Sequence, residues 1–238
     1  MDFERAWTQA ETIEGWLTRG QARMLFDAAA QTRAGETIVE IGSHQGRSTV
    51  ILASAKPPGV NMVAVDPFED VRWGGGPGAI DIFDGNLRAA GLRNEVTLVR
   101  RYGAEAGRAW SDGPVGMLFL DGAHDYSTVV SDLTAWLTHL SPNAAVLMHD
   151  AYSAPGVTRA AFRFMFGHPT FVYASSSGSL VRFQRASARR PLSRLVSAMR
   201  MFARLAWLAR NLAVKAAMMR GWRLVPRLLG HSDSIYPY

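Results

Sequence analysis

The stretch from Thr37 to Thr49 constrains the fold of this chain more than any other. Thr37–Ile41 is a short β-branched run between two glycines, which is typical of a buried parallel strand. Gly42 then begins a tight turn, and Gly46 stands where a helix over residues 48–55 would start. A strand that passes through a glycine turn into a helix presents unpaired backbone N–H groups to a ligand. An ordinary α/β connection has the same pattern, so this stretch alone leaves both interpretations open.

A second strand is predicted over 61–66, and it ends in an acid. Asp66 follows Gly46 by 20 residues, a position from which a carboxylate can bind both hydroxyls of a ribose. The alternative is an aspartate that caps a turn. The glycine spacing, Glu40-x-Gly42-x-x-x-Gly46, is not the G-x-G-x-x-G of dinucleotide-binding folds. A nucleoside-containing cofactor other than a nicotinamide dinucleotide is therefore favoured.

The rest of the chain alternates strands with helices. This order predicts an α/β fold with a Rossmann-like, doubly wound, mostly parallel seven-stranded sheet that ends in an antiparallel strand pair. Glycine-dense residues 71–78 are interpreted as a loop over the active site. Further strands are predicted over 95–100, 115–121, 143–150, 170–173 and 179–183, with helices over 80–91, 126–140 and 156–167.

Composition excludes several classes of protein. The 238 residues are 48% hydrophobic, so a full core is available, and the absence of cysteine excludes disulfides and thiolate metal sites. The first residues lack the pattern of a secretory signal, and no apolar stretch is long enough to span a bilayer. We therefore expect a cytoplasmic protein.

Charge divides the chain into a mildly acidic body and a basic tail. Residues 1–185 carry 16 Lys and Arg against 19 Asp and Glu, whereas residues 186–238 carry 10 against 1. The acidic balance of the body argues against a nucleic-acid partner. We predict a helical N-terminal cover over 1–34, a catalytic domain over 35–185 and a basic helical tail over 186–238.

The tail contains leucine, methionine and tryptophan between arginines, with no acid from Arg190 to Arg227. On one continuous helix, the basic residues would share a sector of about 120°. Two interpretations stay open: a basic amphipathic helix that contacts a membrane surface or an acidic partner, or a helix for self-packing or homodimerisation. The residues of this basic sector are Arg190, Arg194, Arg200, Arg204 and Lys215.

Polar residues follow the carboxyl ends of four predicted strands. Ligands of open α/β sheets bind at this edge, so these side chains are expected to meet at one site. They are Glu40, Asp66, Asp121, His149 and Asp150.

The motifs resemble those of class I S-adenosylmethionine-dependent methyltransferases. Asp121-Gly-Ala-His124-Asp125-Tyr126 and His149-Asp150 closely resemble the macrocin-type and other sugar O-methyltransferases, a likeness that covers about residues 36–165. The resemblance implies that Glu40 helps to hold the cofactor's amino group and that Gly103-Ala104-Glu105 lies near its adenine. The full set implied for cofactor binding is Glu40, Gly42, Ser43, Gly46, Ser48, Asp66, Gly103, Ala104, Glu105 and Asp121.

A parallel with catechol O-methyltransferase implies a metal and a base. By position, Asp121, His149 and Asp150 correspond to its magnesium ligands, and His124 stands where its catalytic lysine does. Imidazole suits Mn²⁺ or Zn²⁺ better than Mg²⁺, so the metal is left open between Mg²⁺ and softer ions. The plainer alternative is that His149 lies in the core and Asp150 caps the next helix.

These residues suit methyl transfer to oxygen. An alcohol needs to lose its proton to attack, and a histidine with a pKa near neutrality, or a metal ion, can assist. We expect catalysis by His124 and Asp121, with a sugar hydroxyl as acceptor. The alternatives are a small phenolic or polyketide hydroxyl and a non-catalytic, membrane-associated module.

Overall fold

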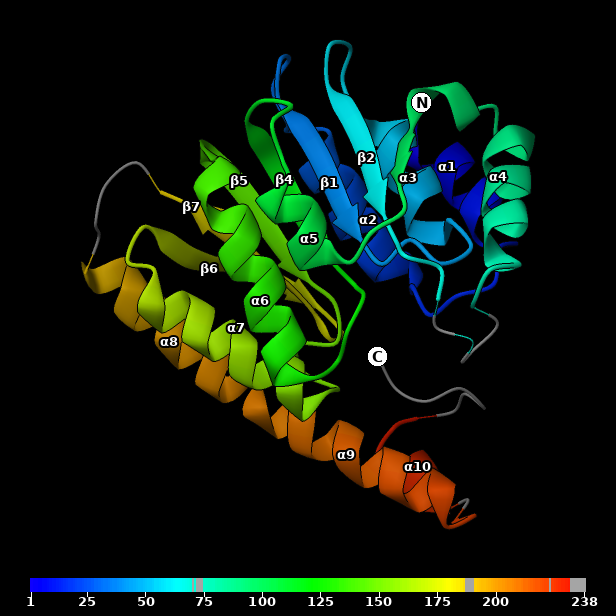
Figure 1. The fold of residues 1–238 in the computed structure, drawn as a ribbon. Helices are drawn as coiled ribbons and strands as arrows, with labels where there is room; N and C mark the ends of the chain where they lie inside the picture. The colour runs from blue at the N-terminus through cyan, green and yellow to red at the C-terminus, as the bar shows by residue number, and fades with distance from the viewer. Residues whose placement is uncertain (70, 72–74, 187–190, 223, 232–238) are drawn as a thin grey trace.

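A mixed sheet of seven strands runs through the molecule in the computed structural model, with helices on both faces (Figure 1). The structure describes residues 1–69, 71, 75–186, 191–222 and 224–231. The sheet order is β3-β2-β1-β4-β5-β7-β6, and β7 pairs antiparallel with both β5 and β6 while the other pairs are parallel. The predicted fold class is confirmed. The strands are β1 (Thr37–Ile41), β2 (Asn61–Val65), β3 (Thr97–Val99), β4 (Val115–Leu120), β5 (Leu140–Met148), β6 (Phe171–Ser177) and β7 (Leu180–Arg185).

Helices cover the sheet in two layers that meet two separate cores (Figure 1). The helices α1 to α4 pack on one face of the sheet and α5 to α7 on the other. They are α1 (Phe3–Ala10), α2 (Arg19–Ala29), α3 (Arg47–Ala55), α4 (Ala79–Ala89), α5 (Gly103–Arg108), α6 (Tyr126–Trp136) and α7 (Pro155–Gly167). Two 3₁₀ turns, Arg93–Glu95 and Leu137–His139, precede β3 and β5.

Strand β4 shows why its sequence reads as one continuous apolar run. Successive side chains of a strand point to opposite faces, and here Met117 and Phe119 enter one core while Leu118 and Leu120 enter the other. All four are buried. Parallel strands that are covered by helices on both faces therefore lose the alternation of polar and apolar residues.

Helix α6 is shorter than the predicted helix over 126–140. It begins at a cap, where Asp125 accepts a hydrogen bond of 2.9 Å from the Thr128 N–H. It ends at Trp136, whose fully buried ring donates to the Gly103 carbonyl at 2.9 Å. Burying a ring of this size stabilises the fold by about 3 kcal/mol. The next residues form a 3₁₀ turn, because Leu140 already pairs with Val115 in the sheet.

The hairpin at the end of the sheet is tighter than predicted. Residues 174–178 lie between the two predicted strands, but strand β6 continues as far as Ser177, which pairs directly with Leu180. Gly178 takes the left-handed conformation in the turn (φ +54°). Serine side chains tolerate strand geometry here, and a register shift between Tyr173 and Ser175 absorbs the irregularity.

The described part of the tail forms three helices, two of which are almost collinear. Helices α8 (Pro191–Ala203) and α9 (Leu205–Met219) meet at Arg204, which keeps a right-handed helical conformation, and α10 (Leu224–Leu228) packs against α9. The pair forms a long rod along α7 (Figure 1). Within the described ranges, no helix has both the length and the apolarity needed to cross a bilayer. Arg190 of the predicted basic sector and residues 72–74 of the predicted loop lie outside the described residues.

Candidate active site

The turn after β1 is built on close backbone packing. Gly42 is left-handed (φ +89°), and a Cβ at this position would lie 2.6 Å from the backbone of Asp121 and Gly122. The Gly42 N–H also donates to the Val65 carbonyl at 2.9 Å. Only glycine permits this approach, and it brings the ends of β1, β2 and β4 together at one edge.

Asp66 clamps this turn. Its Oδ2 accepts hydrogen bonds of 2.9 Å from the N–H groups of both Ser43 and His44, and its Oδ1 accepts one of 2.7 Å from the Phe68 N–H. An ionised carboxylate has about four acceptor sites. Three are used within the protein, which leaves about one for a ribose hydroxyl rather than the two that the sequence predicts.

Glu40 lies beneath the turn, fully buried. Its Oε2 accepts a 2.5 Å hydrogen bond from the Thr49 hydroxyl, while among the described residues its Oε1 has no hydrogen-bond partner. Burial raises the pKa of Glu40 to about 7, although the neighbouring hydroxyls of Ser48 and Thr49 oppose the shift. The predicted contact between Glu40 and a cofactor amino group is therefore not available in this arrangement, because the turn lies between the carboxyl and the cavity.

We expect Glu40→Gln to make the fold less sensitive to pH. Between the ordinary value of 4.5 and about 7, the folded protein holds a proton that the unfolded chain has lost, so the wild type loses stability as the pH rises. The glutamine side chain does not titrate, so the variant should not lose this stability as the pH rises. Thermal unfolding near pH 5 and near pH 8 measures it, with exposed Glu105→Gln as the control. An equal fall in Tm for wild type and Glu40→Gln would refute the assignment.

A large cavity of about 1210 Å³ opens at this edge of the sheet. Glu40 and Gly46 do not line it: Glu40 is buried below, and Gly46 begins helix α3 against Phe83. The other predicted site residues do line it, namely Gly42, Ser43, Ser48, Asp66, Gly103, Ala104, Glu105, Asp121, His124, His149 and Asp150.

Two histidine–carboxylate pairs lie at the ends of β4 and β5. The buried His149 bonds through Nδ1 to Asp121 Oδ1 at 3.0 Å, and the half-exposed His124 bonds through Nε2 to Asp150 Oδ2 at 3.1 Å. Asp150 Oδ2 also lies 3.8 Å from His149 Nδ1, so the two pairs form one cluster. The hydroxyl of Ser153 donates to Asp150 as well.

Each charge in this cluster shifts its neighbours. The hydrogen bond that His124 donates to Asp150 raises the pKa of His124 above its ordinary value, although partial burial opposes this. Burial lowers the pKa of His149, but Asp121 and Asp150 outweigh it and raise that pKa to about 9. The two histidines in turn hold the pKa of Asp150 far below its usual range, despite its burial. The cluster is therefore a buried imidazolium between two carboxylates, beside a second histidine that can exchange a proton at the cavity wall.

The predicted metal site is not assembled. Among the residues that the structure describes, no group of three or more His, Cys, Asp or Glu side chains is placed to hold a metal ion. His149 Nδ1 is engaged with Asp121 rather than turned with it toward a shared centre, and Asp150 is bound by His124 and Ser153. The structure brings these residue types together, but His149 Nδ1, Asp121 Oδ1 and both oxygens of Asp150 are engaged within the cluster.

Backbone strain is concentrated at the same cavity. Among the described residues, three that are not glycine are left-handed, and all three line it: His44 (φ +46°), Phe68 (φ +56°) and Asp150 (φ +56°). Such conformations cost about 1 kcal/mol or more each and persist where the surrounding structure enforces them. The strain coincides with the turn and with the histidine–carboxylate cluster.

Several cavity residues were not predicted. Trp16 comes from the segment between α1 and α2, where its ring lies 5.6 Å from that of His44, and Arg47 holds this segment by donating to the Gly15 carbonyl at 2.8 Å. Lys215 comes from α9 and donates to the Ser153 carbonyl at 3.0 Å. No local pattern marks a loop tryptophan or one tail lysine as a site residue, because only tertiary packing brings them there.

Asp132 is a further unpredicted residue of the cavity. Burial raises its pKa to about 6, and the N–H of Ala104 partly offsets the shift. A Cβ at Gly103 would lie 2.7 Å from its Oδ1, which explains a glycine at the start of α5. One signal was present in the sequence: an acid within the otherwise apolar side of the predicted helix over 126–140.

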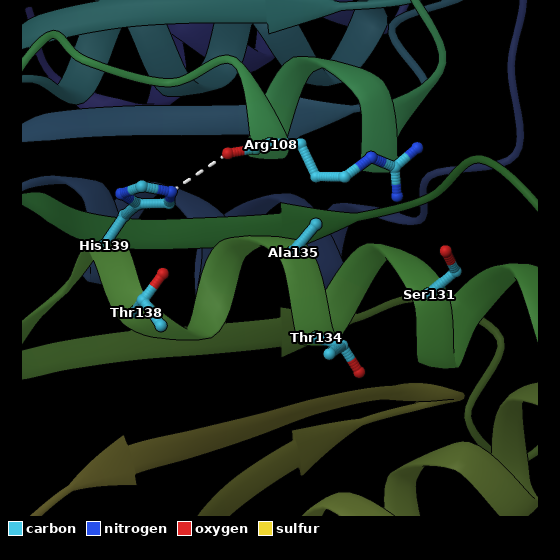
Figure 2. A pocket seen from close by; sticks show the side chains of 7 residues that line it. Arg108, Ser131, Thr134, Ala135, Thr138 and His139 are labelled. Atoms are coloured by element: carbon cyan, nitrogen blue, oxygen red, sulfur yellow. Dashed lines mark hydrogen bonds between the residues drawn. The ribbon is translucent and has the colours of Figure 1, made fainter.

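A smaller hollow of about 550 Å³ lies between α5 and α6 (Figure 2). It shares Arg108 and Ser131 with the large cavity, and His139 bonds to the Gly107 carbonyl at 2.9 Å along its wall. Its seven lining residues include no acid. The titratable cluster belongs to the large cavity alone.

Comparison with known proteins identifies the domain. Residues 39–151, from β1 to the loop after β5, match a family model described as a methyltransferase domain. This segment is therefore a methyltransferase domain, which confirms the family suggested by the sequence motifs. A curated relative, an uncharacterized protein y4gI of Sinorhizobium fredii (strain NBRC 101917 / NGR234), is 30% identical over 150 residues, which are 57% of this chain and 15% of that protein. The chain thus matches only a small part of its relative's length.

Solved structures share the fold. The O-methyltransferase TomG of Streptomyces achromogenes, in complex with SAM, is 19% identical, with a TM-score of 0.57 over 78% of this chain and 91% of that chain. An O-methyltransferase of Bacillus cereus in complex with SAH is 16% identical, with a TM-score of 0.58 over 76% and 89%. At these identities the likeness is one of fold.

Proposed function

We propose that this class I S-adenosylmethionine-dependent methyltransferase methylates a hydroxyl oxygen of a saccharide-containing acceptor. The observation that carries the proposal is the pair of His124 and Asp150 in the wall of the same cavity as the glycine turn. Methyl transfer to an alcohol needs a group that takes the hydroxyl proton, and a half-exposed imidazole held by a carboxylate is such a group.

The expected cofactor fits the residues at one end of the cavity. Gly42 and Ser43 of the glycine turn line the cavity, Asp66 keeps about one acceptor site, and Gly103 and Ala104 start helix α5 nearby. When bound, S-adenosylmethionine supplies an activated methyl group on a sulfonium sulfur. The chain's task is then to orient the acceptor oxygen and to remove its proton.

His124 is the group that we assign to the proton. Its Nε2–H donates to Asp150, which leaves Nδ1 to accept the proton of the hydroxyl as the new C–O bond forms. The imidazolium that results is stabilised by the Asp150 carboxylate. Charge stays balanced, because the positive charge lost at sulfur appears on His124. Asp121 is occupied with His149, so its part in this scheme is to hold the buried imidazolium and orient the cluster.

The resemblance to catechol O-methyltransferase also implies metal assistance, but this arrangement of side chains does not fit a metal ion. His149 Nδ1, Asp121 Oδ1 and both oxygens of Asp150 are bonded within the cluster, so no step is assigned to a metal ion. The ion pairs supply the electrostatic role instead.

The polarity of one wall of the cavity favours a saccharide over a phenol. Along the β4–α6 side, the wall is formed by Asp125, Ser127, Thr128 and Ser131, whose carboxylate and hydroxyl groups suit an acceptor with many hydroxyls. Apolar walls would bind a planar phenol more favourably. A phenolic or polyketide hydroxyl stays the alternative acceptor.

A transfer assay tests the proposal. We expect calorimetry to show binding of S-adenosylhomocysteine and none of NAD. Labelled methyl groups should pass from the cofactor to saccharides with free hydroxyls faster than to catechol, and a chelator should leave the rate unchanged. Faster transfer to catechol would show that the acceptor is a phenol rather than a saccharide. Loss of turnover with chelator would show that a metal ion takes part in the reaction. Binding without transfer to any hydroxyl acceptor would favour a non-catalytic module.

A further inference from the structure

The outward face of helix α8 is apolar. Four large hydrophobic side chains follow one another at spacings of three and four residues, so they form one stripe. Their exposed fractions are high: Leu192 74%, Leu195 59%, Met199 64% and Phe202 55%. A contiguous exposed stripe of this kind marks an interaction surface.

Three residues of the predicted basic sector, Arg194, Arg204 and Lys215, bond to the body. Arg194 donates to the carbonyls of His168 and Phe166 at 3.3 and 3.4 Å, at the end of α7. Arg204 donates to the Gly178 carbonyl, and Lys215 donates to that of Ser153. These bonds satisfy carbonyl groups of the body and turn the opposite side of α8 outward.

The stripe continues onto helix α7. Phe202 lies 5.1 Å from Phe162 and 6.3 Å from Phe166 between ring centroids, and Phe166 is itself 49% exposed. Two arginines of this region, Arg163 on α7 and Arg200 on α8, are exposed. The face thus combines apolar side chains with positive charge at its borders.

A second apolar group lies at and just beyond the other end of the rod, from the last residue of α9 to α10. Met219, Trp222, Leu224 and Leu228 are 55–84% exposed, and Arg220 stacks over the Trp222 ring at 5.6 Å. Tryptophan and arginine side chains of this kind favour the boundary between water and lipid headgroups. The rod therefore offers two apolar ends on a basic segment.

We infer that the outer side of the α8–α9 rod binds the surface of an anionic phospholipid bilayer. Residues 191–231 contain eight Lys and Arg and no acid, and three of these basic residues, Arg200, Arg220 and Arg227, are exposed. The charge on the outer side therefore complements phosphate headgroups. A second copy of this chain is the competing occupant. Placed face to face, two copies would bring Arg163 and Arg200 of each together, with no acid of the rod to pair with them. The apolar side chains would insert among the headgroups without spanning the bilayer.

Vesicle sedimentation with the full chain tests this inference. Wild-type protein should sediment with vesicles of phosphatidylcholine and phosphatidylglycerol, less with phosphatidylcholine alone, and less at high salt. The double variant Leu195→Ser/Met199→Ser should lower the partition coefficient about tenfold. Arg200→Glu should weaken binding to the anionic vesicles in particular.

Matched controls come from helix α4, at another edge of the molecule (Figure 1). Ile82→Ser and Arg88→Glu replace an apolar and a basic side chain of similar exposure and should leave vesicle binding unchanged. Equal losses in the α4 variants, or no vesicle binding of the wild type at low salt, would overturn the inference. A concentration-dependent dimer that Leu195→Ser/Met199→Ser dissociates, without vesicle binding, would assign the face to a second copy. None of these readouts depends on methyl transfer.

Discussion

Gly42→Ala should abolish measurable binding of S-adenosylhomocysteine, a loss of at least about a hundredfold in affinity, and should lower the Tm. The added Cβ would lie 2.6 Å from the backbone of Asp121 and Gly122, and backbone atoms cannot rotate away as a side chain can. The left-handed conformation adds about 1–2 kcal/mol, and overpacking against the β4 loop adds about 1–3 kcal/mol. Isothermal titration and thermal unfolding would measure the two effects.

Gly35→Ala separates strain from collision. Gly35 has nearly the same backbone angle (φ +83°), but an added Cβ would meet no atom within 4 Å. This variant should lose about 1 kcal/mol of stability and retain cofactor affinity. If Gly42→Ala behaved like Gly35→Ala in both measurements, the contact between the glycine turn and the β4 loop would not shape the site.

His124→Ala should lower kcat by about a hundredfold or more while leaving the affinity for S-adenosylhomocysteine nearly unchanged. That is the usual size of a general-base contribution. His139→Ala is the matched control, because His139 lies in the outer hollow between α5 and α6, outside the large cavity (Figure 2). Turnover should be followed with acceptor in excess, so that a change in KM does not mimic a change in kcat.

The pH profile distinguishes a base from a structural histidine. The neutral imidazole is the active form, so the rate should rise with pH through the pKa of His124. Asp150 raises that pKa above the ordinary 6.5, so the midpoint should lie higher, and Asp150→Asn should move it downward. Turnover that survives His124→Ala with an unchanged profile would transfer the role of base to Asp121.

The sheet and the edge that carries the site were predictable because both follow from local patterns. The apolar run of β4 and the glycine turn after β1 each specify an element, and parallel strands bring their carboxyl ends to one edge. Asp121, His124 and Asp150 could therefore be grouped from sequence alone. Whether their donor atoms would converge on a metal or bond to one another depends on side-chain rotation, which no spacing encodes.

The tail shows a different limit. A helical wheel correctly grouped Arg194, Arg204 and Lys215, but it cannot say which side of a helix meets the body. Exposed basic residues and basic residues that donate to buried carbonyls look alike in a sequence. Here the carbonyls at the end of α7 and in the hairpin turn decided the orientation, and those partners lie 26 or more residues away along the chain.

The bonds from α9 to the loop after β5 constrain how this chain can change in length. Asn211 donates to the Tyr152 carbonyl at 3.0 Å and Lys215 to that of Ser153, directly after His149 and Asp150. A helix turns by about 100° per residue, so one residue inserted between Met201 and Asn211 would swing both donors away from the loop. Insertions before Pro191 leave that register intact. Homologous chains should therefore vary freely in length ahead of the rod and hold a constant count of residues within it.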